Sequence, residues 1–252
     1  MTLRRVGILG GMGPEATVLL MQKIIAATPA RDDSDHIPLI VDQNPQVPSR
    51  IRHLIERTGD DPSPVLAAMA RRLQAAGAEA LAMPCNTAHH YATAIRAAVT
   101  VPMIDMVQLS VTHAARLAGR GGRVGILASP AVRQVGLFDA ACTAAGLTAA
   151  YAKDEPAMLA AIRAIKAGGA TVAARATLAQ ASSDLLAEGA AVQMIACTEF
   201  SIIADAVDPG VTAFDTLDQL VSGIIAFATD RGAGHDKADT HPPRTSAHAP
   251  TI

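Results

Sequence analysis

Two stretches of the chain repeat one another at a separation of 112 residues. LQAAGAEALAMPC at 73–85 aligns with LLAEGAAVQMIAC at 185–197, and each stretch ends in a cysteine, Cys85 or Cys197. In each copy a helical pattern ends at a glycine, which suits a helix C-cap, and an apolar run typical of a buried strand follows. A chain with such self-similarity is expected to build the same supersecondary unit twice.

The segment RVGIL also occurs twice, at 5–9 and at 123–127. Such apolar runs alternate with longer Ala-rich helical stretches, which is typical of βαβ units and parallel sheets. We expect buried strands at 5–11, 37–43, 78–84, 101–106, 122–129 and 191–197, and a less apolar seventh at 211–216.

We therefore predict an α/β fold of two pseudo-symmetric domains, each with a parallel sheet flanked by helices, and an active site in the cleft between them. The first domain comprises residues 1–103, which contain Cys85, and a returning helical segment at 214–229. The second domain comprises residues 104–213 and contains Cys197.

Composition disfavours several classes of protein. The formal net charge is −2, and Lys and Arg occur without a basic run or interleaved aromatic residues, so we expect no nucleic-acid binding. The N-terminal apolar segment is too short for a secretory signal and is broken by glycines, so we expect a cytoplasmic protein without a membrane span. Residues 230–252 are rich in Gly, Pro, Ser and charge, and we predict that they are disordered.

The three cysteines form no C-x-x-C pair and match no zinc-site spacing, so we expect neither a disulfide framework nor a metal site. Cys142 is interpreted as a small buried hydrophobe. Cys85 and Cys197 follow strands at the edge where open parallel sheets bind ligands, next to helix N-termini that favour a thiolate. A thiolate and a thiol on opposite faces of a carbon can exchange a proton across it, which stereoinversion requires.

The neighbours of these cysteines suit a carboxylate ligand. Asn86 and Thr87 follow the first cysteine and Thr198 follows the second, and amide and hydroxyl donors beside free helix N–H groups make an anion site. Glu199 comes in the first turn of the next helix, where a carboxylate can simply complement the helix dipole. His89 is interpreted either as a hydrogen-bonded structural histidine or as a partner of a thiol.

Five motifs, in the order GILGGMGPEAT, NPQVPSR, GDDPSP, MPCNTAH and CTE, span about residues 6–200. Together they resemble the aspartate/glutamate racemase superfamily, and most closely its aspartate racemase branch. The resemblance implies a homodimer that racemises acidic amino acids, aspartate first, without pyridoxal phosphate or another cofactor and without a metal. It also implies a two-base mechanism in which Cys85 and Cys197 exchange the α-proton of the substrate.

The resemblance also implies roles for further residues. Carried over by position, Arg50 and Lys166 recognise substrate carboxylate, and a guanidinium plus an ammonium is more charge than one carboxylate needs, which favours a dicarboxylate. The α-carboxylate would be bound by Asn86, Thr87, the backbone of Ala88 and Thr198. Two further positions, Met12 and Ser129, lie on loops that border the substrate.

Two alternatives remain open. The loop ASPAV keeps only Ser129 of several hydroxyls usual in the family, so a broad-specificity racemase or a diacid isomerase of the same superfamily is a second hypothesis. GMGPEA at 11–16 fits G-x-G-x-x-A, the pattern of a dinucleotide-binding oxidoreductase. Against this third hypothesis, Asp42 is a loose fit to the usual acidic partner, Glu15 would sit where pyrophosphate must approach, and the second cysteine copy is left unexplained.

Overall fold

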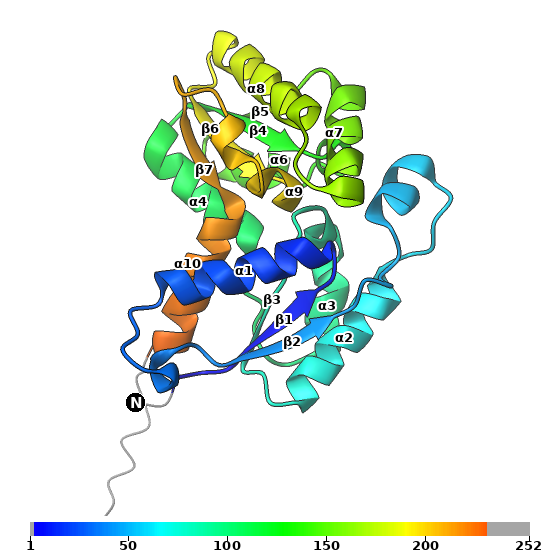
Figure 1. Cartoon of the computed structure of the whole chain (residues 1–252), viewed down its shortest axis with the longest axis vertical. Helices are drawn as coiled ribbons and strands as arrows, with labels where there is room; N and C mark the ends of the chain where they lie inside the picture. Colours follow the sequence, from blue (N-terminus) through cyan, green and yellow to red (C-terminus); the bar gives the residue numbers. More distant parts are fainter. Residues whose placement is uncertain (1–2, 231–252) are drawn as a thin grey trace, which may run out of the picture.

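The computed structural model, which describes residues 3–230, contains two parallel sheets, one in the upper half and one in the lower half of the molecule as drawn in Figure 1. The first sheet has the order β2-β1-β3, with β1 at Val6–Gly10, β2 at Leu39–Gln43 and β3 at Ala80–Ala82. The second has the order β5-β4-β6-β7, with β4 at Arg123–Ala128, β5 at Thr148–Tyr151, β6 at Val192–Ala196 and β7 at Thr212–Asp215. The predicted α/β fold with two parallel sheets is confirmed. The predicted disordered tail lies outside the described residues, apart from Asp230.

Helices cover both faces of the first sheet because successive strand residues point to opposite sides. Leu9 of β1 packs with α2 (Ser63–Ala75) and α3 (Ala92–Ala98). Val6 and Ile8 pack on the other face, with α1 (Pro14–Ala27) and α10 (Thr216–Thr229). The sheet is therefore the middle layer of three.

The second sheet is covered in the same way. Leu127 of β4 packs with α7 (Glu155–Gly168) and α8 (Val172–Ala187), and Ile126 packs with α4 (Met106–Ala118) and α6 (Asp139–Ala144). The remaining short elements are η1 (Asp33–Asp35), the π-helix η2 (Arg52–Glu56), η3 (Thr87–Tyr91), α5 (Pro130–Gln134), α9 (Thr198–Ser201) and η4 (Ala204–Ala206).

The sequence repeat corresponds to equivalent hydrogen-bond registers in the two sheets. Val6 of β1 pairs with Ala80 of β3, and the residue 118 positions later, Val124 of β4, pairs with Val192 of β6. The same register continues along both pairs of strands, with Ile8 opposite Ala82 and Ile126 opposite Met194, although β6 continues to Ala196. The two repeated cysteine segments therefore emerge from equivalent positions.

The chain passes between the two halves where α4 begins and again where β7 meets α10. These two helices pack closely, because a Cβ atom at Gly223 of α10 would lie 2.6 Å from the Cδ1 atom of Leu109 in α4. The domain boundaries at 103/104 and 213/214 stay a prediction. The packing of α10 on the first sheet supports them, although β7 extends through Asp215 within the second sheet.

Two strand predictions differ from the structure. The segment 101–106 forms only an isolated parallel bridge, between Met103 and Leu81, because α4 already begins at Met106. The edge strand β5 was not expected, since Thr148–Tyr151 is short, contains two alanines and is exposed at its first residue, which leaves a weak strand pattern. The seventh candidate, at 211–216, is present as β7.

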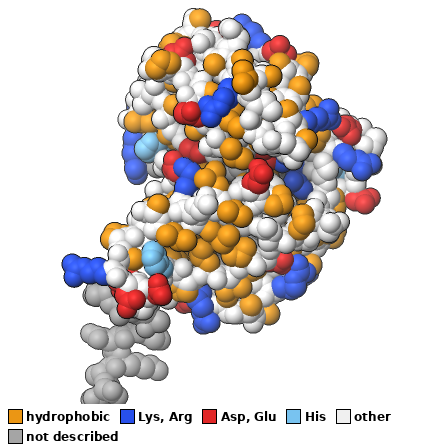
Figure 2. All heavy atoms as spheres, viewed as in Figure 1, with side chains coloured by type: hydrophobic (Ala, Val, Ile, Leu, Met, Phe, Trp, Pro, Cys, Tyr) orange, Lys and Arg blue, Asp and Glu red, His pale blue; other side chains and the backbone are white. Residues whose placement is uncertain are grey.

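Charged side chains of both signs are mixed over the face of the molecule in Figure 2, and no basic stretch gathers there. In the part of the chain that the structure describes, no helix is both long enough and apolar enough to cross a bilayer.

The returning helix α10 should contribute strongly to stability, because Leu220 is fully buried among residues of α1, β1 and α4. We expect Leu220→Ala to lower the free energy of unfolding by about 3 kcal/mol, measured by urea denaturation. Leu117→Ala on α4 is the matched control, because Leu117 is 42% exposed, and it should cost less than about 1 kcal/mol. Equal losses in the two variants would show that α10 does not complete the first core.

Candidate active site

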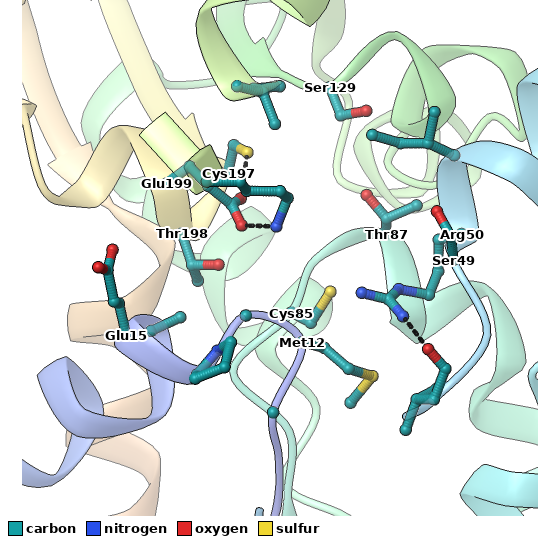
Figure 3. Close-up of a pocket in the computed structure, with 18 of the residues that line it drawn as sticks. Met12, Glu15, Ser49, Arg50, Cys85, Thr87, Ser129, Cys197, Thr198 and Glu199 are labelled. Carbon is teal, nitrogen blue, oxygen red and sulfur yellow. Dashed lines mark hydrogen bonds and ion pairs between the residues drawn. The ribbon is translucent and has the colours of Figure 1, made fainter. Parts of the chain in front are cut away.

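A cavity of about 470 Å³ lies between the two halves, at the carboxyl ends of the strands (Figure 3). The first half contributes the β1–α1 loop, the loop after β2 and the loop after β3. The second half contributes the residue after β4, the inner side of α7 and the segment from Cys197 to Ile202. The cavity therefore has walls from both copies of the repeat.

Most of the predicted site residues line this cavity: Met12, Arg50, Cys85, Thr87, Ser129, Lys166, Cys197 and Thr198. Figure 3 shows the two sulfur atoms reaching the cavity from different elements, Cys197 from the end of β6 and Cys85 from the loop after β3. Asn86 and Ala88 are not among the lining residues, and they are 2% and 0% exposed. The pair of thiols predicted from the repeat is thus brought to one cavity.

Asn86 makes a buried connection between the two halves. Its Nδ2 donates to Oγ1 of Thr216 at 3.0 Å, and that hydroxyl donates to the carbonyl oxygen of Ile195 in β6, also at 3.0 Å. The side-chain oxygen of Asn86 is buried and has no hydrogen-bond partner among residues 3–230. In this state the side chain ties the Cys85 loop to the strand that carries Cys197, whereas we expected it to face a substrate carboxylate.

The β1–α1 loop reaches the cavity through a turn that only glycine can make. Gly11 has φ +91°, and a Cβ atom there would lie 2.4 Å from the carbonyl carbon of Asn44. The N–H of Gly11 donates to Oγ1 of Thr17 in α1 at 2.9 Å. This turn carries Met12 into the cavity wall.

The loop that carries Cys85 is held by a buried histidine. Nδ1 of His89 lies 2.8 Å from the carbonyl oxygen of Cys85, and because a carbonyl only accepts, Nδ1 carries the proton. Burial lowers the pKa of His89, so the ring is neutral near pH 7. His89 contacts the backbone of Cys85 and acts as a structural histidine, one of the two interpretations that its position in the sequence left open.

Cys197 has a carboxylate beside it that the sequence did not assign to the site. The thiol of Cys197 donates to Oε2 of Glu199 at 3.0 Å, and Oε1 of Glu199 forms an ion pair with Nζ of Lys166 (Figure 3). Glu199 is 8% exposed and lines the cavity. The motif CTE was the available signal, but only the fold brings Lys166 to this carboxylate.

The ionisation of Cys197 differs from the prediction. We expected a helix N-terminus to stabilise a thiolate at both cysteines, but α9 contains only four residues, and burial together with Glu199 raises the pKa of Cys197 well above its ordinary value. Burial disfavours the charged form of Lys166, yet its pKa is raised overall because Glu199 and the two cysteines lie close by. Lys166 is therefore a stable cation in the cavity.

Arg50 enters the cavity from the loop after β2 (Figure 3), whereas Lys166 lines it from α7. Its Nη1 donates to the carbonyl oxygens of Val47 and Pro48 at 3.2 and 2.7 Å, which fixes the guanidinium against its own loop. The guanidinium has further N–H groups in the same plane that can donate to an anionic ligand.

The features needed for a dinucleotide site or a metal site are not assembled here. Asp42, the acidic partner that the dinucleotide hypothesis requires, lies in β2 and pairs with Arg72 at 2.7 Å. Glu15 lines the cavity beside the glycine loop, where it would repel a pyrophosphate. Within residues 3–230, no group of three His, Cys, Asp or Glu side chains could hold a metal ion.

Comparison with known proteins finds an amino-acid racemase among the relatives of this chain. A broad-specificity amino-acid racemase, RacX of Bacillus subtilis (strain 168), is 31% identical over 110 residues, which are 42% of this chain and 47% of that protein. The match thus spans about half the length of this curated relative.

Solved structures of similar fold extend over nearly all of the chain. An aspartate racemase of Picrophilus torridus superposes with a TM-score of 0.78 at 24% identity, covering 89% of this chain and 94% of that one. A putative Asp/Glu racemase from Yersinia pestis superposes with a TM-score of 0.72 at 20% identity, covering 90% of this chain and 100% of that one. At these identities the likeness establishes the fold.

The family model described as Asp/Glu/hydantoin racemase matches residues 9–223, which include both cysteines and every residue of the cavity. The dinucleotide-binding hypothesis is therefore set aside, and the chain belongs to the Asp/Glu/hydantoin racemase family of enzymes.

Proposed function

We propose that the protein racemises amino acids, aspartate first, by a two-base mechanism that uses Cys85 and Cys197 and needs no cofactor. One observation carries the proposal: two thiols from register-equivalent strands of a repeated unit line the same cavity. A homodimer and a cytoplasmic location, both expected from the sequence, stay predictions.

In this mechanism a thiolate on one side takes the α-proton of the substrate and becomes a thiol. The electron pair left on the α-carbon is delocalised into the α-carboxylate, and the opposite thiol then donates its proton to the other face and becomes a thiolate. The reverse direction exchanges the two roles. Because each sulfur can act as an acid or as a base, the pair needs no further proton carrier at the α-carbon.

The hydroxyl-bearing residues Thr87 and Thr198 line the cavity from the two halves and are the proposed ligands of the α-carboxylate. Arg50 and Lys166 are the proposed partners of a carboxylate on the substrate side chain. Electrostatic attraction of these two cations also favours the negative charge that develops during proton abstraction.

A broad-specificity racemase is the second candidate, and the charge balance of the cavity favours it. Glu199 already neutralises Lys166, and Glu15 adds another carboxylate to the lining. The apolar side chains of Val47, Ile162 and Ile202 lie in the same walls, where a neutral substrate side chain would fit. The similarity to the Bacillus subtilis racemase supports this candidate as well.

The cysteines provide the first test of the mechanism. We expect Cys85→Ala and Cys197→Ala each to lower racemisation of L- and D-aspartate by at least about 10²-fold, because each variant lacks one of the two bases. The measurement is polarimetry together with incorporation of solvent deuterium at the α-carbon.

Cys142→Ala is the matched control for these variants. Cys142 lies in α6, 1% exposed and outside the cavity, and burial raises its pKa to about 11, so its loss should leave the rate within a factor of a few. Full racemisation by either single active-site variant would end the two-base proposal.

Arg50 provides the test of substrate class. Arg50→Ala should raise the KM for aspartate by about 10- to 100-fold, because a charge-assisted hydrogen bond is worth roughly 1.5–3 kcal/mol, while turnover of alanine should change little. Arg52→Ala, an exposed neighbour outside the cavity, is the control. Equal effects of Arg50→Ala on aspartate and on neutral amino acids would favour the broad-specificity candidate instead.

A further inference from the structure

We propose that Glu199 is a positioning residue that keeps Cys197 protonated in the free enzyme, so that Cys85 is the resting base and Cys197 the resting acid. The inference rests on the proposed function for its meaning in catalysis. Its physical content, the location of one proton, can be measured without turnover.

The geometry around Cys197 gives the first argument. A carboxylate only accepts hydrogen bonds, so the 3.0 Å contact between Sγ of Cys197 and Oε2 of Glu199 requires the sulfur to carry its hydrogen. If Cys197 lost that proton, two negative charges would face one another at this separation in a buried site. Burial and Glu199 both raise the pKa of Cys197, in agreement with the contact.

The second argument comes from a position at which the two copies of the repeat differ. Cys85 is followed by Asn86 and Thr87, whereas Cys197 is followed by Thr198 and Glu199, so a neutral hydroxyl occupies in the first half the place of the carboxylate in the second. Among the described residues, no carboxylate is hydrogen-bonded to the sulfur of Cys85. The two thiols therefore lie in equivalent strand positions with unequal charges beside them.

Lys166 holds the carboxylate of Glu199 in place. The ion pair with Lys166 occupies Oε1 of Glu199, which leaves Oε2 for the thiol. A Cβ atom at Gly13 would lie 3.7 Å from Nζ of Lys166 and 3.8 Å from Oε1 of Glu199, so the pair rests against the β1–α1 loop of the other half.

Five charged or titratable groups line the cavity together with Cys197. Glu199 lies on its own short helix, and the others are Lys166 on α7, Cys85 across the cavity, Glu15 on α1 and Arg50 after β2. Lys166 acts against Glu199, since its positive charge favours a thiolate. The effect of Glu199 on the pKa of Cys197 is the larger one, because Glu199 contacts the sulfur directly, whereas the ammonium of Lys166 is paired with the carboxylate.

This arrangement has a consequence for each catalytic cycle. The enantiomer whose α-hydrogen faces Cys85 can react with the resting enzyme directly, because Cys85 is already the base and Cys197 already the acid. After that reaction Cys85 is a thiol and Cys197 is a thiolate beside Glu199, and the site returns to rest when Cys85 releases a proton to water and Cys197 takes one up. Glu199 favours this return because it destabilises the thiolate of Cys197.

The test is alkylation of each cysteine by iodoacetamide between pH 6 and 10, with rates measured by peptide mass spectrometry. Only a thiolate attacks the reagent, forming a carbon–sulfur bond as iodide leaves. Cys85 and Cys197 are similarly exposed, at 8% and 6%. At pH values below those at which the alkylation rates become constant, the ratio of the two rates therefore reports the ratio of the two thiolate fractions. In the wild-type enzyme we expect Cys85 to react at least about tenfold faster than Cys197 at pH 8.

In Glu199→Gln, the rate at Cys197 should rise by about tenfold or more at pH 8 and its pH midpoint should fall, while Cys85 changes little. Glu15→Gln is the matched control, because it removes a cavity carboxylate that does not contact the thiol, and it should leave Cys197 unchanged. The double variant Glu199→Gln with Lys166→Met tests whether the freed lysine alone causes the rise. We expect the rise to persist there.

Protection of Cys142, which is 1% exposed, reports in every sample that the protein is folded. Equal midpoints of Cys85 and Cys197 in the wild type, or an unchanged Cys197 midpoint in Glu199→Gln, would overturn the proposal, as would loss of the rise in the double variant. Solvent deuterium exchange on the same samples tests racemisation separately. The expected alkylation pattern without deuterium exchange would support the assignment of the proton to Cys197 and contradict the proposed racemase function.

Discussion

The parallel hydrogen-bond register of β1 with β3, and its counterpart of β4 with β6, is the constraint on which the site depends. A slip of one residue in either pair would turn every side chain of that strand to the opposite face and displace the cysteine that follows. Three-layer packing prevents such a slip, because each face of the central strands buries a different set of apolar residues. Cys85 and Cys197 are themselves members of these apolar cores, at the side that borders the cavity. The packing of the cores thus fixes the positions of the two sulfur atoms.

A second set of interactions connects the two halves at the level of the cavity. Thr216 begins α10 and is fully buried, and its hydroxyl joins Asn86 of the first half to Ile195 of the second. The preceding residue, Asp215, accepts hydrogen bonds from Ser201 and from the N–H of Leu217, and burial raises its pKa to about 6. The junction between β7 and α10 therefore orders the floor of the site as well as the path of the chain.

The sequence was sufficient for the fold class, because the repeat and the alternation of apolar runs with helical stretches are local signals. It was also sufficient for the cysteine pair, since the second copy of the repeat identifies what one cysteine alone cannot. It failed where a contact joins distant residues. Glu199 and Lys166 are 33 positions apart and Asn86 and Thr216 are 130 apart, so neither partner was evident from local patterns. The short strand β5 was missed for a different reason, namely that its alanines lack the β-branched and aromatic character of typical strands.

The close packing of α4 on α10 has a mechanical consequence. Within the described residues the chain crosses between the halves only near these two helices, and Gly223 allows the two helices to pack side by side. Two adjacent crossings permit rotation about their common line and resist sliding or twisting in other directions. If the two halves moved apart about these crossings, the distance between the two sulfur atoms and the distance between Arg50 and Lys166 would change together.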